Sequence, residues 1–374
     1  MQIGCPREIK PQEFRVGMTP DAVTEAVAHG HGVLVETGAG EGAGFADDDY
    51  LAAGARILPD AAAVYAGADL IVKVKEPQPT ERALLRRGQV LFAYLHLAPD
   101  PGQTRELLDS GVTAIAYETV TNAQGGLPLL APMSEVAGRL APQVGAWALQ
   151  KINGGRAVLL GGVPGVPPGN VVIIGGGVVG TAAARVAVGM GANVTVLDRS
   201  VPRLSCLDDM FMGKLNTQYA SAAAVAGLLP AADMVIGAVL VPGASTPRLV
   251  RRDQLALMQP GAVMVDVAID QGGCFETSRP TTHDDPIYQV DGIIHYCVGN
   301  MPGAVARSST QALGNATLPF VIALADKGWR QAVAEDPHLR AGLAMHDGRL
   351  TSLPVAQAQD LQAINPDQLL AEQG

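Results

Sequence analysis

The stretch Val171-Val-Ile-Ile-Gly-Gly-Gly-Val-Val-Gly180 decides the fold of this chain. Its first four residues form a β-branched apolar run of strand length, and its glycines at 175, 177 and 180 follow the pattern G-x-G-x-x-G. The small residues of 181–191 predict a helix, and Asn193–Asp198 predicts a second strand. The sequence therefore predicts a strand–helix–strand unit with a glycine-rich first turn.

Each glycine of this turn has its own physical reason. Gly175 permits the tight turn, Gly177 lets the backbone approach a pyrophosphate, and Gly180 lets the helix pack close to the strand. Asp198, at the end of the second strand, is placed to accept hydrogen bonds from ribose hydroxyls. A glycine-rich turn without a ligand is the alternative, since the chain holds 44 glycines. The combination of strand, helix, strand and acid favours a dinucleotide site.

The composition argues against several classes of partner. The chain has 374 residues, enough for about two domains, and its formal net charge of −10 disfavours nucleic acid and anionic membranes. The N-terminus has no apolar signal-peptide core. The cysteines form no C-x-x-C pair, which predicts buried, reduced thiols at Cys5, Cys206, Cys274 and Cys297. Together these features predict a cytoplasmic protein without a membrane span.

The first 130 residues alternate short apolar runs with helix-like segments. The expected strands are Gln2–Cys5, Gly32–Glu36, Leu70–Lys75, Val90–His96 and Thr113–Glu118. Helices are expected at Pro20–His29, Thr80–Arg87 and Thr104–Ser110, and from Ser134, as N-cap, to Lys151. Such alternation is typical of a largely parallel sheet covered on both faces.

We therefore predict an α/β protein with two doubly wound, Rossmann-like parallel-sheet domains and a cleft between them. Residues 1–133 are expected to form the substrate and catalytic domain, joined by a helical C-terminal segment, 308–374. Residues 134–307 are expected to form the dinucleotide-binding domain.

Ligands of open α/β sheets bind beyond the carboxyl ends of the strands, and this rule selects the candidate residues. Lys75, His96 and Glu118 end three of the predicted strands of the first domain, and Arg15 follows its first strand. In the second domain Asp270 ends the run Val263–Asp270, and Asp198 is expected to end a neighbouring strand. The prediction is that these groups gather at two strand edges.

Each candidate also has a structural alternative. His96 would serve equally as a packed core histidine, and Lys73 and Lys75 as surface lysines with solvated ammonium groups. Glu118 is expected to be a structural partner or cap, and Asp266 to bind backbone N–H groups.

Several longer segments are similar to bacterial alanine dehydrogenases. They are Lys75-Glu-Pro77, Ala131-Pro-Met-Ser-Glu-Val-Ala-Gly-Arg139, Gly161-Gly-Val-Pro-Gly-Val166, Gly237-Ala-Val-Leu-Val-Pro-Gly243, Val267-Ala-Ile-Asp-Gln-Gly-Gly-Cys-Phe-Glu276 and Tyr296-Cys-Val-Gly-Asn-Met-Pro302. The resemblance covers the first strand to about residue 330. The wider family includes the NAD-binding subunit of proton-translocating transhydrogenase and the saccharopine-forming dehydrogenases.

The resemblance implies NAD-dependent, reversible oxidative deamination of L-alanine to pyruvate and ammonium by a homo-oligomer, a hexamer in this family. It implies that Arg15 and Lys75 bind the substrate, that His96 transfers the proton and that Asp270 assists at the reacting carbon. It also implies an NAD site formed, besides the glycine turn and Asp198, by Ser134, Arg203, Val239, Leu240, Val267, Ala268, Ile269, Asp270, Arg279, Val298, Gly299, Asn300 and Met301.

Two alternatives remain open at this stage. One is a soluble NAD(H)-binding subunit of a transhydrogenase, and the other is a dehydrogenase for a larger amino acid. The four residues Arg15, Lys75, His96 and Asp270 favour an enzyme, because a nucleotide carrier has no chemical need for them. No metal is expected, since Ala323 and Lys327 stand where some family members have Glu and His.

Overall fold

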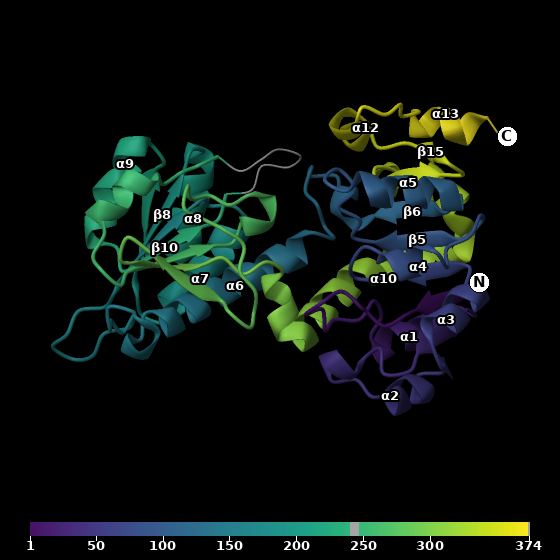
Figure 1. Ribbon diagram of the computed structural model, residues 1–374, viewed down its shortest axis with the longest axis horizontal. Helices are drawn as coiled ribbons and strands as arrows, with labels where there is room; N and C mark the ends of the chain where they lie inside the picture. The colour runs from purple at the N-terminus through teal and green to yellow at the C-terminus, as the bar shows by residue number, and fades with distance from the viewer. Residues whose placement is uncertain (240–246, 373–374) are drawn as a thin grey trace. The chain divides into compact units, whose positions relative to one another are not determined.

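The structure is a computed structural model that describes residues 1–239 and 247–372. The chain divides into two compact units, Met1–Met133 with Val305–Gly374, and Ser134–Ala304. Each unit contains one sheet with its own helices (Figure 1). Both sheets are largely parallel, which confirms the predicted α/β class with two sheets.

The sheet of the first unit has eight strands in the order β15-β14-β6-β5-β4-β1-β2-β3. Its parallel strands are β1 Gln2–Cys5, β2 Gly32–Glu36, β3 Arg56–Leu58, β4 Leu70–Val72, β5 Val90–Ala93 and β6 Thr113–Ala116. The helices are α1 Pro20–Ala28, α2 Asp47–Ala52, α3 Ala61–Gly67, α4 Pro79–Arg82, α5 Pro101–Ser110, α10 Ala306–Glu335, α11 Pro337–Arg340, α12 Leu353–Gln359 and α13 Pro366–Ala371.

Three strands of this sheet end earlier than the sequence predicts. They end at Val72, Ala93 and Ala116 rather than at Lys75, His96 and Glu118. For β4 and β5 the reason is competition for the backbone: the N–H of Val74 donates to the carboxylate of Glu8, and the N–H of Leu95 donates to that of Glu118. These carboxylates bind N–H groups on one side of each strand, while the N–H of Tyr94 still donates to the carbonyl of Val74 between the two segments.

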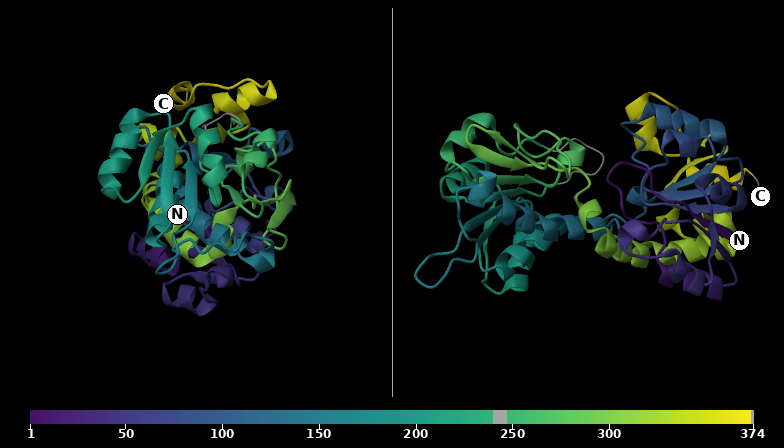
Figure 2. Two further views of the ribbon diagram at one scale, coloured as in Figure 1. Left: turned by 90° about the vertical axis from the view of Figure 1, so that its left-hand side faces the viewer. Right: turned by 60° about the horizontal axis from the view of Figure 1, so that its bottom comes forward.

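The C-terminal segment is not wholly helical, so that prediction is wrong in part. β14, Leu343–His346, pairs antiparallel with β6, and β15, Arg349–Leu350, pairs antiparallel with β14. Two residues with positive φ, Asp347 and Gly348, form the turn between them. An Asp-Gly pair is a strong hairpin signal. The yellow C-terminal segment consequently lies beside the blue strands of the first unit in the right-hand view of Figure 2.

The sheet of the second unit has seven strands in the order β12-β13-β11-β10-β7-β8-β9, with β12 antiparallel. The strands are β7 Asn170–Ile174, β8 Asn193–Asp198, β9 Asn216–Tyr219, β10 Met234–Gly237, β11 Val263–Asp266, β12 Ile287–Val290 and β13 Ile293–Tyr296. The helices are α6 Ala131–Ala148, α7 Val178–Gly189, α8 Val201–Phe211 and α9 Ala222–Leu228. Among the described residues, no helix is both long and apolar enough for a membrane span.

Three details of the second unit correct the sequence predictions. Helix α6 begins at Ala131, so Ser134 lies inside the helix and is not its N-cap. Asp198 does not end a strand next to β11, because β7 and β10 lie between β8 and β11. Cys206 is exposed, since its turn of α8 faces solvent, whereas the other three cysteines are buried as predicted.

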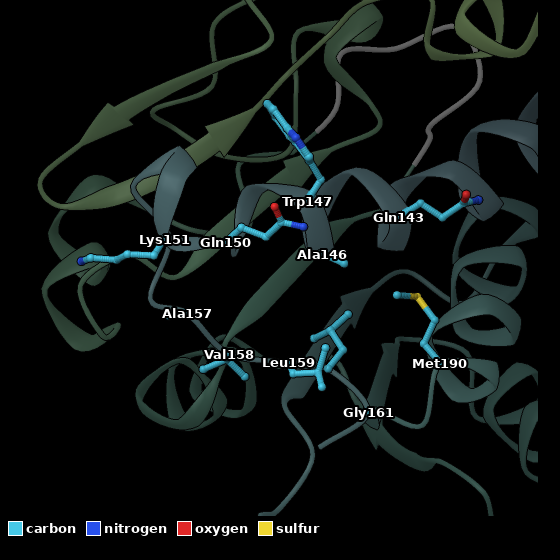
Figure 3. A pocket seen from close by; sticks show the side chains of 11 residues that line it. Gln143, Ala146, Trp147, Gln150, Lys151, Ala157, Val158, Leu159, Gly161 and Met190 are labelled. Carbon is cyan, nitrogen blue, oxygen red and sulfur yellow. The ribbon is translucent and has the colours of Figure 1, made fainter. Parts of the chain in front are cut away.

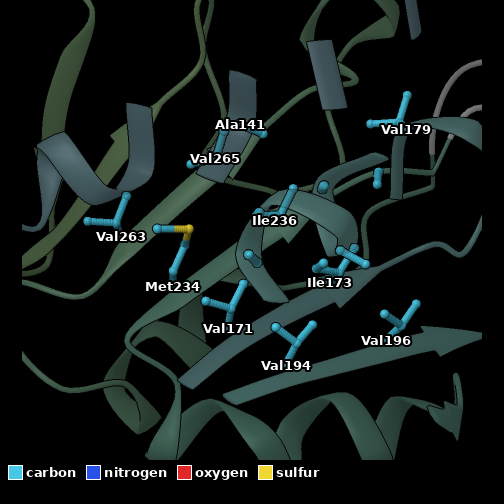
Figure 4. Packing of buried hydrophobic residues seen from close by; sticks show 14 of the residues in the cluster. Ala141, Val171, Ile173, Val179, Val194, Val196, Met234, Ile236, Val263 and Val265 are labelled. Carbon is cyan, nitrogen blue, oxygen red and sulfur yellow. The ribbon is translucent and has the colours of Figure 1, made fainter. Parts of the chain in front are cut away.

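Both faces of the second sheet are buried, as the unbroken apolar run of β7 indicates. Val171 and Ile173 point to one hydrophobic cluster, part of which Figure 4 shows, together with residues of α6 and α7. Val172 and Ile174 point to a second cluster on the opposite face. The glycine turn therefore starts from a strand that is fixed on both sides.

Gly180 determines how closely α7 approaches β7. A Cβ atom at Gly180 would lie 1.8 Å from the carbonyl oxygen of Gly175, which is backbone and has little freedom to move. The predicted reason for this glycine, close packing of helix on strand, is therefore confirmed.

We expect Gly180→Ala to lower the free energy of unfolding by about 1–3 kcal/mol, the usual cost of overpacking. Gly189→Ala is the matched control in the same helix, because a Cβ there meets nothing within 4 Å. That control should raise the free energy of unfolding by less than about 1 kcal/mol. Denaturant unfolding of both variants measures the difference, and equal stabilities would contradict this account of Gly180.

Candidate functional site

The glycine turn between β7 and α7 has the shape that a pyrophosphate requires. Gly175 has φ 106°, and a Cβ there would lie 2.7 Å from the carbonyl oxygen of Ala238. At Gly177, the N-cap residue of α7, a Cβ would meet no atom of the described residues within 4 Å. A phosphate can therefore approach the N-terminus of α7 without obstruction at this position, where N–H groups favour an anion.

Asp198 and Arg203 are both tied to this turn. Asp198 accepts hydrogen bonds from the N–H of Gly176 at 2.7 Å and from the N–H of Ser200 at 2.8 Å. Arg203 donates from Nε to the carbonyl of Gly176 at 2.6 Å and from Nη2 to the hydroxyl of Thr181 at 2.5 Å. A carboxylate has about four acceptor positions, so Asp198 retains acceptor capacity for hydroxyl groups beside these two bonds.

The loops after β10, β11 and β13 lie at the same edge of the second sheet. Val239 follows β10 next to Gly175, and the N–H of Val267 donates to the carbonyl of Gly237 at 3.1 Å. Ala268 and Ile269 are buried, whereas Asp270 is exposed and accepts a bond from the N–H of Asn300 at 3.3 Å. Leu240, also predicted to bind the cofactor, lies outside the described residues.

The remaining predicted cofactor residues border this edge. Val298 and Met301 are buried, and Gly299 lies between them against Oδ1 of Asp270. The exposed Arg279 stacks on the ring of Tyr288 at 4.0 Å, in a segment joined to Val298 by a bridge at Thr281. Ser134 is half-buried, one helical turn before Gly138, which packs against the carbonyl of Val179 at the start of α7.

In the first unit, the structure brings three predicted residues to neighbouring strand ends. Arg15, Lys75 and His96 follow β1, β4 and β5, which are adjacent in the sheet. The loop that carries Arg15 packs on β4, since a Cβ at Gly17 would lie 2.4 Å from the carbonyl oxygen of Val72. These side chains thus share one edge of one sheet.

Arg15 is buried, with 2 % of its surface exposed, and is paired with Glu13. Its Nε and Nη2 donate to the two carboxylate oxygens of Glu13 at 2.6 and 2.5 Å, and its Nη1 donates to Sδ of Met133 at 2.9 Å. A thioether is a weak acceptor, so a carboxylate ligand would be a stronger partner for Nη1. Burial opposes the charge, but the Glu13 carboxylate outweighs it and raises the pKa of Arg15.

His96 is held in an unusual backbone conformation at the end of β5. Its φ is 48°, which a non-glycine residue adopts only at a cost in free energy. The carboxylate of Glu118 holds this conformation by accepting bonds from the N–H groups of Leu95 at 3.2 Å and of His96 at 2.7 Å. Glu118 is therefore a structural cap, as predicted. The imidazole is half exposed, so His96 is not a packed core histidine.

Lys73 and Lys75 lie in different environments, although the sequence suggests the same structural alternative for both, a surface lysine with a solvated ammonium group. Lys73 is fully buried, which rules out a solvated surface lysine, and its Nζ lies 3.1 Å from Glu8 and 2.7 Å from Glu81. Lys75 is half buried, and its N–H lies 3.4 Å from the same Glu8 carboxylate. Burial would lower the pKa of Lys73, but the glutamates and Tyr65 raise it.

Two hollows lie in very different places. One of about 430 Å³ in the first unit is lined by Arg15 together with Glu8 and Glu13. A larger, more apolar hollow of about 780 Å³ in the second unit lies between Trp147 of α6 and Leu159 (Figure 3). The residues that line the larger hollow include none of the predicted site residues. The size of a hollow therefore does not identify the reactive site.

Sequence reasoning gave no role to several residues that contact the predicted site. They are Lys10, Glu13, Glu76 and Tyr94. Glu13 and Glu76 are each within two residues of a predicted substrate-binding residue, which was the available signal. Over residues 1–239 and 247–372, no group of three His, Cys, Asp or Glu residues could hold a metal ion.

Two family models match nearly the whole chain. The model described as "Alanine dehydrogenase/PNT, N-terminal domain" matches residues 4–137, and "Alanine dehydrogenase/PNT, C-terminal domain" matches residues 141–353.

Individual proteins give the same result. The alanine dehydrogenase of Halomonas elongata is 59% identical over 99% of this chain and 100% of its own length. A solved L-alanine dehydrogenase is 51% identical, with a TM-score of 0.93, over 96% of this chain and 99% of that one. A transhydrogenase structure from Sinorhizobium meliloti is 26% identical, with a TM-score of 0.81, over 94% and 99% of the two chains. This chain therefore belongs to the alanine dehydrogenase/PNT family.

Proposed function

We propose that this protein catalyses the NAD-dependent, reversible oxidative deamination of L-alanine to pyruvate and ammonium. The observation that carries the proposal is the gathering of Arg15, Lys75 and His96 beyond three adjacent strands. That set supplies an anion-binding group, a cation and an acid/base group at one edge. The family relatives named as alanine dehydrogenases support the same activity. By the family resemblance, we also propose a cytoplasmic homo-oligomer.

The residues of the second unit fit NAD. The turn at Gly175 and Gly177 would hold the pyrophosphate at the N-terminus of α7, and Asp198 would accept hydrogen bonds from the ribose hydroxyls. When bound, NAD takes up the hydride from the α-carbon of alanine, and NADH returns it in the opposite direction.

Arg15 and Lys75 would orient the substrate. The guanidinium of Arg15 would bind the substrate carboxylate, with Glu13 holding the other edge of its fork in a fixed plane. Lys75 would direct its ammonium at the carbonyl oxygen, where negative charge develops as the carbinolamine collapses to pyruvate. Together the two cations would fix a small oxoacid in one orientation.

His96 and Asp270 would handle the proton and the reacting carbon. His96 would take a proton from the water that attacks the iminium, and would return it in the amination direction. Asp270 would stabilise the positive charge of the iminium, and its exposed position after β11 is compatible with that role.

The direct test is purified protein with NADH, pyruvate and ammonium, followed by NADH absorbance. We expect ammonium-dependent oxidation, and a loss on the order of 10²–10⁴ in rate for His96→Ala, the usual contribution of a positioned acid/base group. Absence of ammonium-dependent turnover in the wild type would contradict the proposal and would favour the transhydrogenase-type alternative. Activity with only a larger oxoacid would favour the second alternative, a dehydrogenase for a larger amino acid.

We expect Arg15→Lys to weaken pyruvate binding strongly, because lysine keeps the charge but loses the planar fork that Glu13 holds. KM for pyruvate should rise at least about tenfold, equivalent to about 1.4 kcal/mol, with unchanged Kd for NADH. Arg7→Lys is the matched control, since Arg7 lines the same hollow with a largely exposed side chain. A wild-type KM in Arg15→Lys would remove Arg15 from the substrate site.

We expect a strong preference for NAD over NADP, because a carboxylate at Asp198 repels a 2′-phosphate. Asp198→Asn keeps an oxygen for the N–H of Gly176 but removes the charge, so the NADPH-to-NADH affinity ratio should rise about tenfold or more. Asp209→Asn, on an exposed position of α8, controls for the change in net charge. Fluorescence titration measures both affinities. Equal wild-type use of the two cofactors would show that Asp198 has another role.

A further inference from the structure

One carboxylate oxygen next to the reactive edge is buried without a hydrogen bond of normal length. Glu76 follows Lys75, and its Oε1 pairs with Nζ of Lys10. Its Oε2 is buried and has no hydrogen-bond partner within the described residues. The nearest donor is Nδ1 of His96, at 3.5 Å. A buried anionic oxygen without a donor is unfavourable. A proton on Nδ1 of His96 is therefore favoured, because it gives Oε2 of Glu76 a donor.

The backbone on both sides of this gap is fixed. Glu118 holds the N–H groups of Leu95 and His96, and Nε2 of Gln103 donates to the carbonyl of Leu95 at 2.6 Å. The carbonyl of Val74 accepts the N–H of Tyr94 at 3.1 Å, which joins the segment of Glu76 to that of His96. The segments that carry Glu76 and His96 are therefore held next to each other, with Nδ1 of His96 at 3.5 Å from Oε2 of Glu76.

We propose that Glu76 is a positioning residue for His96: its Oε2 accepts a hydrogen bond from Nδ1–H, and Nε2 is thereby left as the atom that exchanges the proton with substrate. The proposal rests on the proposed function for the role of His96. In a neutral imidazole only one nitrogen carries a proton, so a fixed acceptor at Nδ1 decides which nitrogen is the base.

Glu76 is ionised at neutral pH. Burial would raise the pKa of Glu76, but the nearby imidazole of His96 and the hydrogen bond and positive charge of Lys10 lower it to about 2. The other groups around the imidazole are the ring of Tyr94, stacked at 5.9 Å between centroids, and Glu118, whose oxygens are taken up by backbone N–H groups. Glu76 is therefore the carboxylate that faces Nδ1.

The charges of Glu76 and Lys10 should affect the pH dependence of turnover in opposite directions. A carboxylate beside an imidazole favours the protonated ring. Lys10 partly neutralises Glu76 and opposes that effect. Removing Glu76 should thus lower the midpoint of the kcat/KM profile for alanine against pH, and removing Lys10 should raise it. A group that merely supports the fold would not produce opposite shifts in the two variants.

The first experiment reads the tautomer directly, without turnover. Protein labelled with ¹⁵N-histidine is recorded by NMR at high pH, and His96 is assigned from the signal lost in His96→Ala. In the wild type, Nδ1 should carry the proton. Glu76→Gln keeps an acceptor oxygen and should keep this tautomer, whereas Glu76→Leu should lose it. A wild-type Nε2–H tautomer would overturn the proposal by itself, as would an unchanged tautomer in Glu76→Leu.

The second experiment measures kcat/KM for alanine against pH. Because deamination needs the neutral imidazole, the profile should rise with pH, and its midpoint should fall in Glu76→Gln and rise in Lys10→Met. Glu106→Gln, a half-exposed glutamate of the first unit paired with Arg82, is the charge-matched control and should leave the midpoint in place. Midpoints that do not move in opposite directions would overturn the proposal.

Different results would reject the proposed function and the positioning role of Glu76. A wild type with the Nδ1–H tautomer but no ammonium-dependent turnover would reject the proposed function and leave the Glu76–His96 contact intact. Normal alanine turnover with the other tautomer would reject the positioning role of Glu76 alone.

Discussion

The carboxylate of Glu8 is the interaction on which the reactive edge of the first unit depends. It follows β1, yet it accepts N–H groups of Val74 and Lys75 and pairs with the buried ammonium of Lys73. Breaking such a buried pair by removing one partner typically costs about 3–5 kcal/mol. Because this group binds the N–H groups of Val74 and Lys75 just after β4, the residues that follow leave the sheet at a fixed position. The loops after two neighbouring strands are thereby joined through one side chain.

The second unit fixes the path of its glycine turn without a buried charge at that turn. There, the closeness of the Gly175 carbonyl to Gly180 sets the path of the chain, and the N–H of Gly176 binds Asp198. The first N–H groups of a helix have no partner within the helix, so the N-terminus of α7 suits a ligand with many oxygens. The first unit instead presents long side chains held by buried carboxylates, which suits a small anion. The two edges thus use different physical means for ligands of different size.

The sequence predicts the strands and the glycine turn well where the signal is local. Apolar runs located the starts of the strands, and the glycine spacing explained Gly175 and Gly180 correctly. The ends of β4 and β5 were missed because carboxylates distant in sequence, Glu8 and Glu118, take the backbone N–H groups. Partners such as Lys10 with Glu76 are 66 residues apart, so no spacing rule reveals them. The hairpin of β14 and β15 was missed although Asp347-Gly348 announces its turn.

The pairing of β14 with β6 has a consequence for how the chain is made. During synthesis, β6 emerges more than two hundred residues before its partner Leu343. The second unit is continuous in sequence and can fold in this interval, whereas the first sheet waits with an open edge. An unpaired edge strand is a template for association with other chains. Nascent chains that stall before Leu343 should therefore be the ones that most need a chaperone.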